Sequence, residues 1–191
     1  MATDGSAFLA YFYFDFKDTD KQDSRALLSS LLVQLSDQSD IFFGTLFSLY
    51  SAHKDGSEKP PNHAIARCLK DMLTTAEKVP IYLIIDALDE CPNDSGIPSP
   101  RERVLDLVKE LVELRYSNLR LCITSRPEFD IRRTLEPLAT QQMSLHDENG
   151  QKQDIITYVI SVVHSDRNTM RWRDEDKNMV VEKLSEKADG M

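Results

Sequence analysis

The sequence predicts an α/β protein with a mostly parallel sheet flanked by helices. Three apolar segments typical of strands (8–16, 81–86 and 119–124) are separated by segments whose apolar residues recur at helical spacing. Strands that alternate with helices of this length indicate βαβ units. With 191 residues, 41% of them hydrophobic, the chain can bury one sizeable core. We expect a core domain over residues 1–150 and the start of a helical region over 151–191.

The first predicted elements follow from apolar spacing. Residues 8–16, FLAYFYFDF, carry large apolar side chains on both faces, which is typical of a strand buried on both sides. The leucines at 27, 28, 31, 32 and 35 recur at helical spacing. A second short helix is expected over 41–50, and a loop over 53–62. Asn62 is expected to cap the helix that follows, which has a single apolar stripe.

The next elements are predicted from their boundaries as well as from their apolar residues. Pro80 precedes the strand at 81–86, which is almost entirely apolar. The run Ser99-Pro100-Arg101-Glu102 suits the start of a helix, with Ser99 as N-cap, proline at the first position and the glutamate completing a capping box. The strand at 119–124, LRLCIT, comes after that helix.

The last elements are a helix over about 128–137, an edge strand over 141–145, QQMSL, and two further helices. The first of these carries apolar residues from Ile155 to Val163 at helical spacing, and the second lies within the charged segment 166–189.

Composition excludes several classes of protein. The net charge of −9 and the pI near 4.9 argue against nucleic acid as a partner, because duplex-binding surfaces carry clustered Lys and Arg. No apolar run reaches the roughly 18 to 20 residues that cross a bilayer, so we expect no membrane insertion. Cys68, Cys91 and Cys122 have no CxxC spacing and are expected to be free thiols. With no signal peptide recognised, these thiols predict a cytoplasmic protein.

Acidic side chains end the most apolar strand. In IYLIIDALDEC, residues 81–91, the acids are Asp86, Asp89 and Glu90. Ligands of parallel sheets bind beyond the carboxyl ends of the strands. Asp86 can there hold Mg²⁺ together with phosphate oxygens, Glu90 can polarise an attacking water, and Asp89 can share that task or orient the metal's waters. The alternative is that Asp86 and Asp89 cap a turn while Glu90 is solvated, and this segment alone leaves both interpretations open.

A second polar cluster, Thr124, Ser125 and Arg126, ends the next strand. Pro127 keeps Arg126 in an extended turn, which favours contact between its guanidinium and a terminal phosphate. Thr124 or Ser125 can add a hydroxyl near the same oxygens. The alternative for Arg126 is an ion pair on a surface loop. If the two strands are neighbours, the two clusters lie side by side.

Five segments, FYFDFKD, SLLVQLSDQ, IYLIIDALDEC, LRLCITSRPEFDI and DIITYVISVV, occur here in the order and spacing of NACHT-type nucleoside triphosphatases. The sequence resembles most closely the large group in filamentous fungi related to the nephrocystin-like amino-terminal domain, and DALDE and TSRP are its most specific elements. The resemblance implies a P-loop NTPase-like sheet, Mg²⁺ with ATP or GTP, and a STAND-class signalling switch. It makes Asp86 the Mg²⁺-holding acid of the Walker B segment, Asp89 and Glu90 the water-activating pair, and Arg126 the sensor arginine.

The sequence departs from this pattern in one respect. The family places a P-loop, GxxxxGK[ST], ahead of the first strand found here, and none of the six glycines in this chain is followed by lysine. We therefore expect a sheet that lacks the P-loop and its strand, unpaired sheet edges, poor nucleotide affinity and negligible hydrolysis by this chain alone. The expected partners are other NACHT-type proteins or missing domains of the same protein. A non-catalytic interaction module and a degenerate fragment remain the alternatives.

Overall fold

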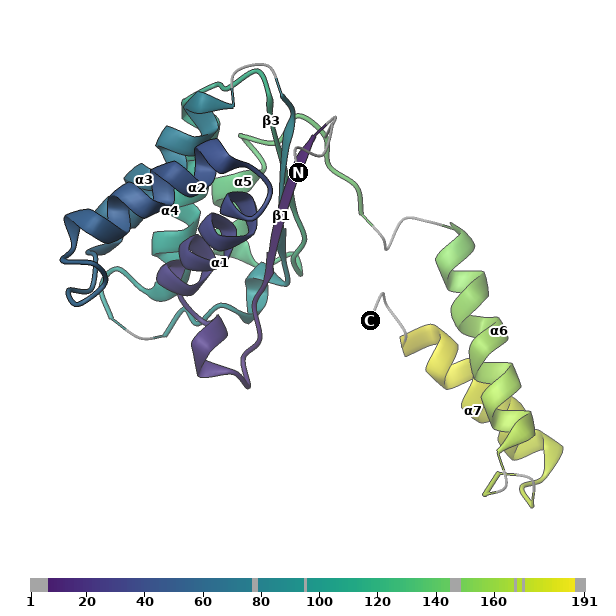
Figure 1. Ribbon diagram of the computed structural model, residues 1–191. Coiled ribbons are helices and arrows are strands. Elements are labelled where there is room, and N and C mark those ends of the chain that lie inside the picture. Colours follow the sequence, from purple (N-terminus) through teal and green to yellow (C-terminus); the bar gives the residue numbers. More distant parts are fainter. Residues whose placement is uncertain are drawn as a thin grey trace. The chain divides into compact units, whose positions relative to one another are not determined.

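A computed structural model describes residues 7–76, 79–94, 96–144, 149–166, 168–169 and 171–187. The chain divides into two compact units, Met1–Ala139 and Thr140–Met191. The second unit consists of two helices packed against each other, α6 (Asn149–Ser165) and α7 (Asp174–Lys187) (Figure 1). Among the described residues, no helix is both long and apolar enough to cross a membrane.

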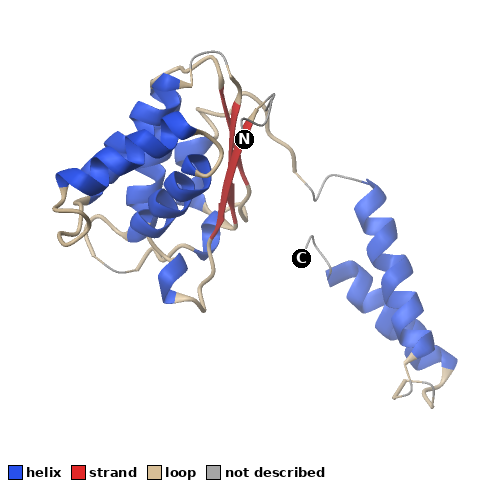
Figure 2. Ribbon diagram, viewed as in Figure 1, coloured by secondary structure: helices blue, strands red, loops and turns tan. Residues whose placement is uncertain are grey.

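The first unit contains a three-stranded parallel sheet (Figure 2). Its strands are β1 (Phe8–Tyr13), β2 (Ile81–Asp86) and β3 (Leu119–Ile123), in the order β1-β2-β3. Ile81 lies opposite Phe8 on one side and Leu119 on the other, so β2 is the central strand. The predicted α/β class with a parallel sheet is confirmed.

Four helices cover one face of this sheet (Figure 1). They are α1 (Ser24–Ser36), α2 (Asp40–Ala52), α3 (Asn62–Thr75) and α4 (Pro100–Glu113). Their apolar stripes and the inward side chains of the strands form one core. The expected cap of α3 is wrong by one residue, because Pro61 occupies the cap position and the Asn62 side chain accepts a hydrogen bond from Arg25 Nη1 at 3.0 Å instead.

The opposite face of the sheet is exposed, which corrects the expectation that the first strand is buried on both sides. β1 ends at Tyr13, and Leu9, Tyr11 and Tyr13 on its outward face are 45–56% exposed. Tyr82 of β2 lies on the same face and is equally accessible. The large side chains on both faces resembled those of a strand between two layers, whereas the helices α1–α4 cover a single face.

Two glutamines, Gln34 of α1 and Gln38 just after that helix, occupy the outer edge of β1. Gln38 accepts a hydrogen bond from the Leu9 N–H at 3.0 Å and donates one to the Leu9 carbonyl at 2.7 Å. Gln34 makes the same pair of contacts with Tyr11, at 3.0 and 2.7 Å. Each side-chain amide thus satisfies the two backbone groups that a neighbouring strand would otherwise bind.

The segment after the sheet differs from its prediction. α5 (Phe129–Leu135) agrees with the helix expected over 128–137, but residues 141–144 form no strand and are exposed. Leu145, the last residue of the expected edge strand, lies outside the described residues. The alternation of polar and apolar residues there is too short to specify a strand without a neighbour, and the side chain of Met143 is exposed.

Candidate functional site

The two polar clusters predicted from the sequence meet at the carboxyl edge of the sheet. β2 and β3 are paired, and their hydrogen bonding continues past the last residue of each strand. The Thr124 N–H donates to the Ile85 carbonyl at 2.9 Å, and the Leu88 N–H donates to the Thr124 carbonyl at 3.0 Å. The expectation that the acidic cluster and the Thr124–Arg126 cluster lie side by side is confirmed.

A left-handed residue turns the chain at the end of β2. Ala87 has φ 53° and ψ 46°, and a short 3₁₀ helix, η2 (Leu88–Glu90), follows it. The turn buries Leu88 in the core and leaves Asp89 and Glu90 partly accessible at the sheet edge. The Thr124 hydroxyl supports this geometry, since it accepts the Ala87 N–H at 3.0 Å and donates to the carboxylate of Asp86.

Asp89 holds Arg126 by two contacts. Its Oδ1 accepts the Arg126 backbone N–H at 2.9 Å, and its Oδ2 lies 3.6 Å from Arg126 Nε. The Asp89 side chain is 10% exposed, whereas that of Arg126 is 79% exposed. The guanidinium therefore remains accessible to a ligand while its backbone is fixed. The Ser125 hydroxyl donates to the Arg126 carbonyl.

Glu90 faces an open, polar depression beside the sheet edge. Its Oε2 accepts the Phe16 backbone N–H at 3.2 Å, which attaches the loop after β1 to the acidic segment. The residues that line the depression include Phe16, Gln22, Asp89, Glu90, Arg101 and Arg126. Asp86 and Thr124 are exposed beside it rather than within it. The structure thus pairs Asp86 with Thr124 and Asp89 with Arg126. In each pair the acid comes from the end of β2 or the turn after it, and its partner comes from the segment after β3.

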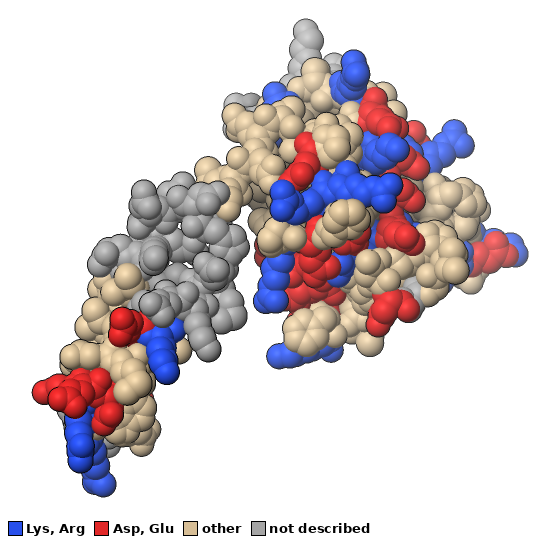
Figure 3. Space-filling model, turned by 180° about the vertical axis from the view of Figure 1, so that it is seen from behind, with Lys and Arg blue, Asp and Glu red and all other residues tan. Residues whose placement is uncertain are grey.

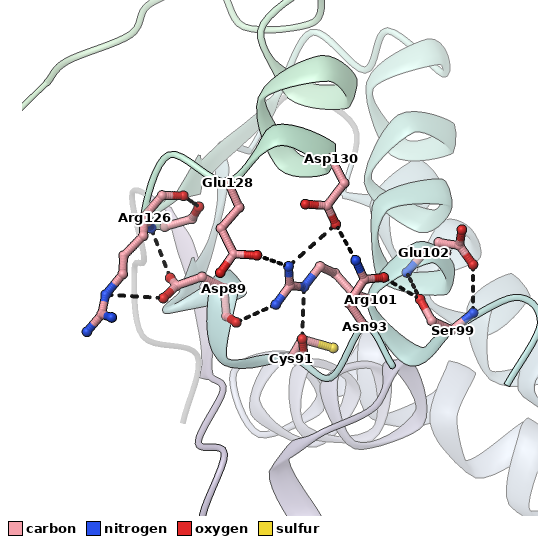
Figure 4. Close-up of polar contacts among 10 residues, drawn as sticks. Asp89, Cys91, Asn93, Ser99, Arg101, Glu102, Arg126, Glu128 and Asp130 are labelled. Atoms are coloured by element: carbon pink, nitrogen blue, oxygen red, sulfur yellow. Dashed lines mark hydrogen bonds and ion pairs between the residues drawn. The ribbon is translucent and has the colours of Figure 1, made fainter. Parts of the chain in front are cut away.

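A buried arginine that sequence reasoning did not assign to the site lies beneath these turns (Figure 4). Arg101, in the first turn of α4, is 5% exposed and contacts the segments on both sides of it. Its Nη2 donates to the Asp89 carbonyl at 2.6 Å and its Nε to the Cys91 carbonyl at 2.8 Å. Its Nη1 pairs with the carboxylates of Glu128 and, at 3.4 Å, Asp130.

The sequence did contain a signal for Arg101. It lies three and four residues before Val104 and Leu105, which are both buried, and so it falls on the apolar stripe of α4. A charged residue on such a stripe predicts a paired, buried cation, but its acceptors lie on other segments and spacing does not identify them.

Metal ligands are sparse at this edge. The described residues contain no group of three or more His, Cys, Asp or Glu side chains placed to hold a metal ion. Asp86 and Thr124 offer two neighbouring oxygen-bearing side chains, which suits an ion that keeps most of its waters better than one that needs a closed protein cage.

Cys91 is not arranged as a nucleophile. Its side chain is buried, and burial raises the pKa of the thiol from 9.0 to about 12, although the nearby Arg101 acts in the opposite direction. The Sγ atom lies 3.4 Å from the Gln22 carbonyl, which it can donate to. A buried thiol whose pKa is raised in this way is a poor nucleophile.

Charged side chains of the first unit are mixed in sign on the face that Figure 3 shows, where blue and red groups are interspersed. That face carries no broad basic surface of the kind that binds a nucleic-acid backbone.

A sequence model of one family, described as Nephrocystin 3, N-terminal, matches residues 1–126. The chain belongs to this family. The matched residues of this nephrocystin 3 N-terminal domain contain all three strands and both polar clusters, up to Arg126. No curated protein and no solved structure matches the chain.

Proposed function

We propose that this nephrocystin-like domain is the Walker B and sensor portion of a NACHT-type nucleoside triphosphatase, in a cytoplasmic STAND-class signalling protein like those of filamentous fungi. One observation carries the proposal: the Thr124 hydroxyl bridges the Asp86 carboxylate and the Ala87 N–H at the carboxyl edge of a parallel sheet. An acid and a polar turn joined at that edge favour a phosphate ligand with its metal.

Asp86 would hold Mg²⁺, and its surroundings fit that ion. One exposed carboxylate with a neighbouring hydroxyl suffices, because Mg²⁺ takes one or two protein carboxylates and completes its shell with water and phosphate oxygens. ATP or GTP would supply the phosphates. The exposed guanidinium of Arg126 would contact the terminal phosphate, and the hydroxyls of Thr124 and Ser125 lie on the same turn.

The two remaining acids take different parts in this proposal. Both carboxylate oxygens of Asp89 face Arg126, so Asp89 fixes the arginine. Glu90 faces the depression and is the group that would polarise the attacking water. Since no GxxxxGK[ST] segment occurs in this sequence, the phosphate cradle has to come from elsewhere, and we expect this chain alone to bind nucleotide weakly and not to turn it over.

Manganese provides a test suited to weak binding, because it replaces Mg²⁺ and broadens nearby NMR signals. Mn²⁺ with ATP or GTP is expected to broaden the backbone amides of 86–90 and 124–126 more than Mn²⁺ alone, since phosphate oxygens complete the ion's shell. Asp86→Asn should remove this broadening, whereas Asp106→Asn, at an exposed acid of α4, should not. The proposal fails if nucleotide adds nothing, or if the broadening survives in Asp86→Asn.

Turnover tests Glu90 and needs a version of the protein that also carries a P-loop. In that version Glu90→Gln is expected to lower the hydrolysis rate about a hundredfold or more, because the amide no longer accepts a proton from water. An unchanged rate would remove Glu90 from the mechanism.

The exposed sheet face favours a second candidate, a non-catalytic module that binds other NACHT-type proteins or other domains of its own protein. Leu9, Tyr11 and Tyr82 form an accessible apolar surface that a partner could cover. In pull-downs with NACHT-type proteins, the double variant Tyr11→Lys/Tyr82→Lys should lose partners that Ile41→Lys, at an exposed residue of α2, retains. A monomer that binds none of them would exclude this candidate.

A further inference from the structure

Arg101 is a cation held almost entirely out of water. It lies in the first turn of α4, where the positive end of the helix dipole disfavours a positive charge. Removing a charge from water is strongly unfavourable unless the charge is paired and hydrogen-bonded. Helix electrostatics and solvation therefore both oppose a charge at this position, and the groups that it contacts have to offset them.

The acceptors of Arg101 come from two separate segments. The backbone carbonyls of Asp89 and Cys91 belong to the turn after β2, and the carboxylates of Glu128 and Asp130 belong to the start of α5 (Figure 4). A planar guanidinium presents donors in several fixed directions, which allows one side chain to bind both segments at once.

Residues at and before the N-terminus of α4 also hold Asp130, one of the two acids that pair with Arg101. Asn93 Nδ2 donates to Asp130 Oδ2 at 3.1 Å, and the Ser99 hydroxyl donates to Asn93 Oδ1 at 2.9 Å. Ser99 is also the N-cap of α4, where its oxygen accepts the Glu102 N–H at 3.1 Å. The orientation of Asp130 is therefore set by the same helix end that carries Arg101.

We propose that Arg101 is a positioning residue that fixes the 89–91 turn and the 126–130 segment relative to each other. The Asp89 carbonyl bound by Arg101 and the Asp89 carboxylate bound by Arg126 belong to one residue, so the position of the Arg126 guanidinium depends on Arg101. The role of Arg126 toward a phosphate rests on the proposed function, whereas the positioning itself is measurable without any nucleotide.

Hydrogen exchange at the Arg126 amide reports this positioning directly, because that N–H binds Asp89 Oδ1. In Arg101→Met, Arg126 exchange should accelerate about tenfold or more beyond the change at the core amide of Ile85. Arg101→Lys should show most of the same effect, since an ammonium cannot reach both segments. Arg103→Met, at an exposed arginine of the same helix, should leave both amides unchanged.

A purely stabilising role for Arg101 makes a different prediction: exchange at Arg126 and Ile85 would then rise by the same factor. That result would overturn the proposal. If Arg101→Met does not fold, the double variant Glu128→Gln/Asp130→Asn weakens the same ion pairs by changing their more accessible partners. Exchange at Arg126 is then compared with exchange at Ile85 in that variant, with the same two outcomes.

The nucleotide arm separates the two proposals. Suppose that Mn²⁺ with ATP broadens the amide signals of the site in the unaltered chain. Arg101→Met should then reduce the nucleotide-dependent part of that broadening several-fold, and Arg103→Met should not. Equal broadening in all three proteins would overturn the link to Arg126. If the unaltered chain shows no nucleotide effect, the proposed function fails, and the exchange measurements alone decide whether Arg101 positions the two segments.

Discussion

The hydroxyl of Thr124 donates a hydrogen bond to the carboxylate of Asp86 across the ends of two paired strands. The same oxygen accepts the Ala87 N–H at 3.0 Å. One side chain just after β3 thus orients the acid at the end of β2 and satisfies the turn that follows it. Its removal should disturb the site without touching the core.

Thr124→Val tests this relationship, because valine keeps the shape of threonine and lacks the hydroxyl. We expect a loss of about 0.5–1.5 kcal/mol in the free energy of unfolding by urea, the usual contribution of such hydrogen bonds. Thr124→Ser, which retains the hydroxyl, should lose less. Equal losses in the two variants would show that the methyl group, and not the hydroxyl, is the stabilising part.

Ala87 leads to a prediction of opposite sign. A non-glycine residue in the left-handed region costs roughly 1–2 kcal/mol, and Ala87 has φ 53°. Ala87→Gly relieves that strain while adding freedom to the unfolded chain, so the free energy of unfolding should stay the same or rise by up to about 1 kcal/mol. Ala87→Val should instead destabilise the fold.

The control for Ala87 is an alanine in ordinary helical geometry. Ala64 is half-buried near the start of α3, and Ala64→Gly should destabilise by about 1 kcal/mol. The comparison uses urea midpoints measured side by side. If Ala87→Gly lost as much stability as Ala64→Gly, the left-handed turn would not be strained.

Local signals predicted much of the fold. Ser99, Pro100 and Glu102 indicated a helix start, and the structure has the complete capping box with proline in the first turn. The apolar run at 81–86 indicated a strand, and it is the central one of the sheet. Because parallel strands end at a common edge, the sequence could also predict that the Asp86 and Thr124 turns meet there.

Non-local relationships could not be predicted. Both faces of β1 carry large aromatic or apolar side chains, so the sequence does not show which face is covered. Only the placement of the helices decides that Tyr11 is exposed. The acceptors of Arg101 lie on segments before and after its helix, so no local spacing identifies them. The same holds for Gln34 of α1, whose partner Tyr11 lies in β1.

The cysteines should differ sharply in reactivity. Cys122 is exposed, whereas burial raises the pKa of Cys68 from 9.0 to about 11 and that of Cys91 from 9.0 to about 12. A thiol reagent at pH 8 should therefore label one cysteine rapidly in the native protein and the other two only on unfolding. Cys122→Ser should abolish the rapid phase. Rapid labelling of Cys91 in that variant would contradict its burial.

The same thiols predict how stability depends on pH. In the unfolded chain they ionise near pH 9, while in the folded protein they stay neutral to about pH 11 and 12. The stability that these neutral thiols contribute is fully present below pH 9. It is lost as the pH rises from there through their pKa values in the folded protein, because in that range only the unfolded state releases the protons. Urea unfolding between pH 8 and 10 should show this decline, and Cys91→Ala should make it shallower. An unchanged slope would exclude Cys91 as a source.

The last prediction concerns the edge of β1, where Gln34 and Gln38 replace a neighbouring strand. Four backbone groups, the N–H and C=O of Leu9 and Tyr11, depend on these two amides. In Gln34→Met/Gln38→Met the side chains keep their length but lose donor and acceptor. We expect a loss of about 1–3 kcal/mol in the free energy of unfolding, since water can reach and partly satisfy the released groups.

The opened edge should also make β1 available to another chain, because unpaired strand edges are templates for intermolecular pairing. Light scattering over a range of concentrations should show more association in the double variant than in the unaltered protein. Val33→Gln, at an exposed residue of α1 beside Gln34, should change neither property. If the double variant is destabilised without associating further, the glutamines stabilise β1 but do not protect it. If it associates without losing stability, their main effect is to block the edge.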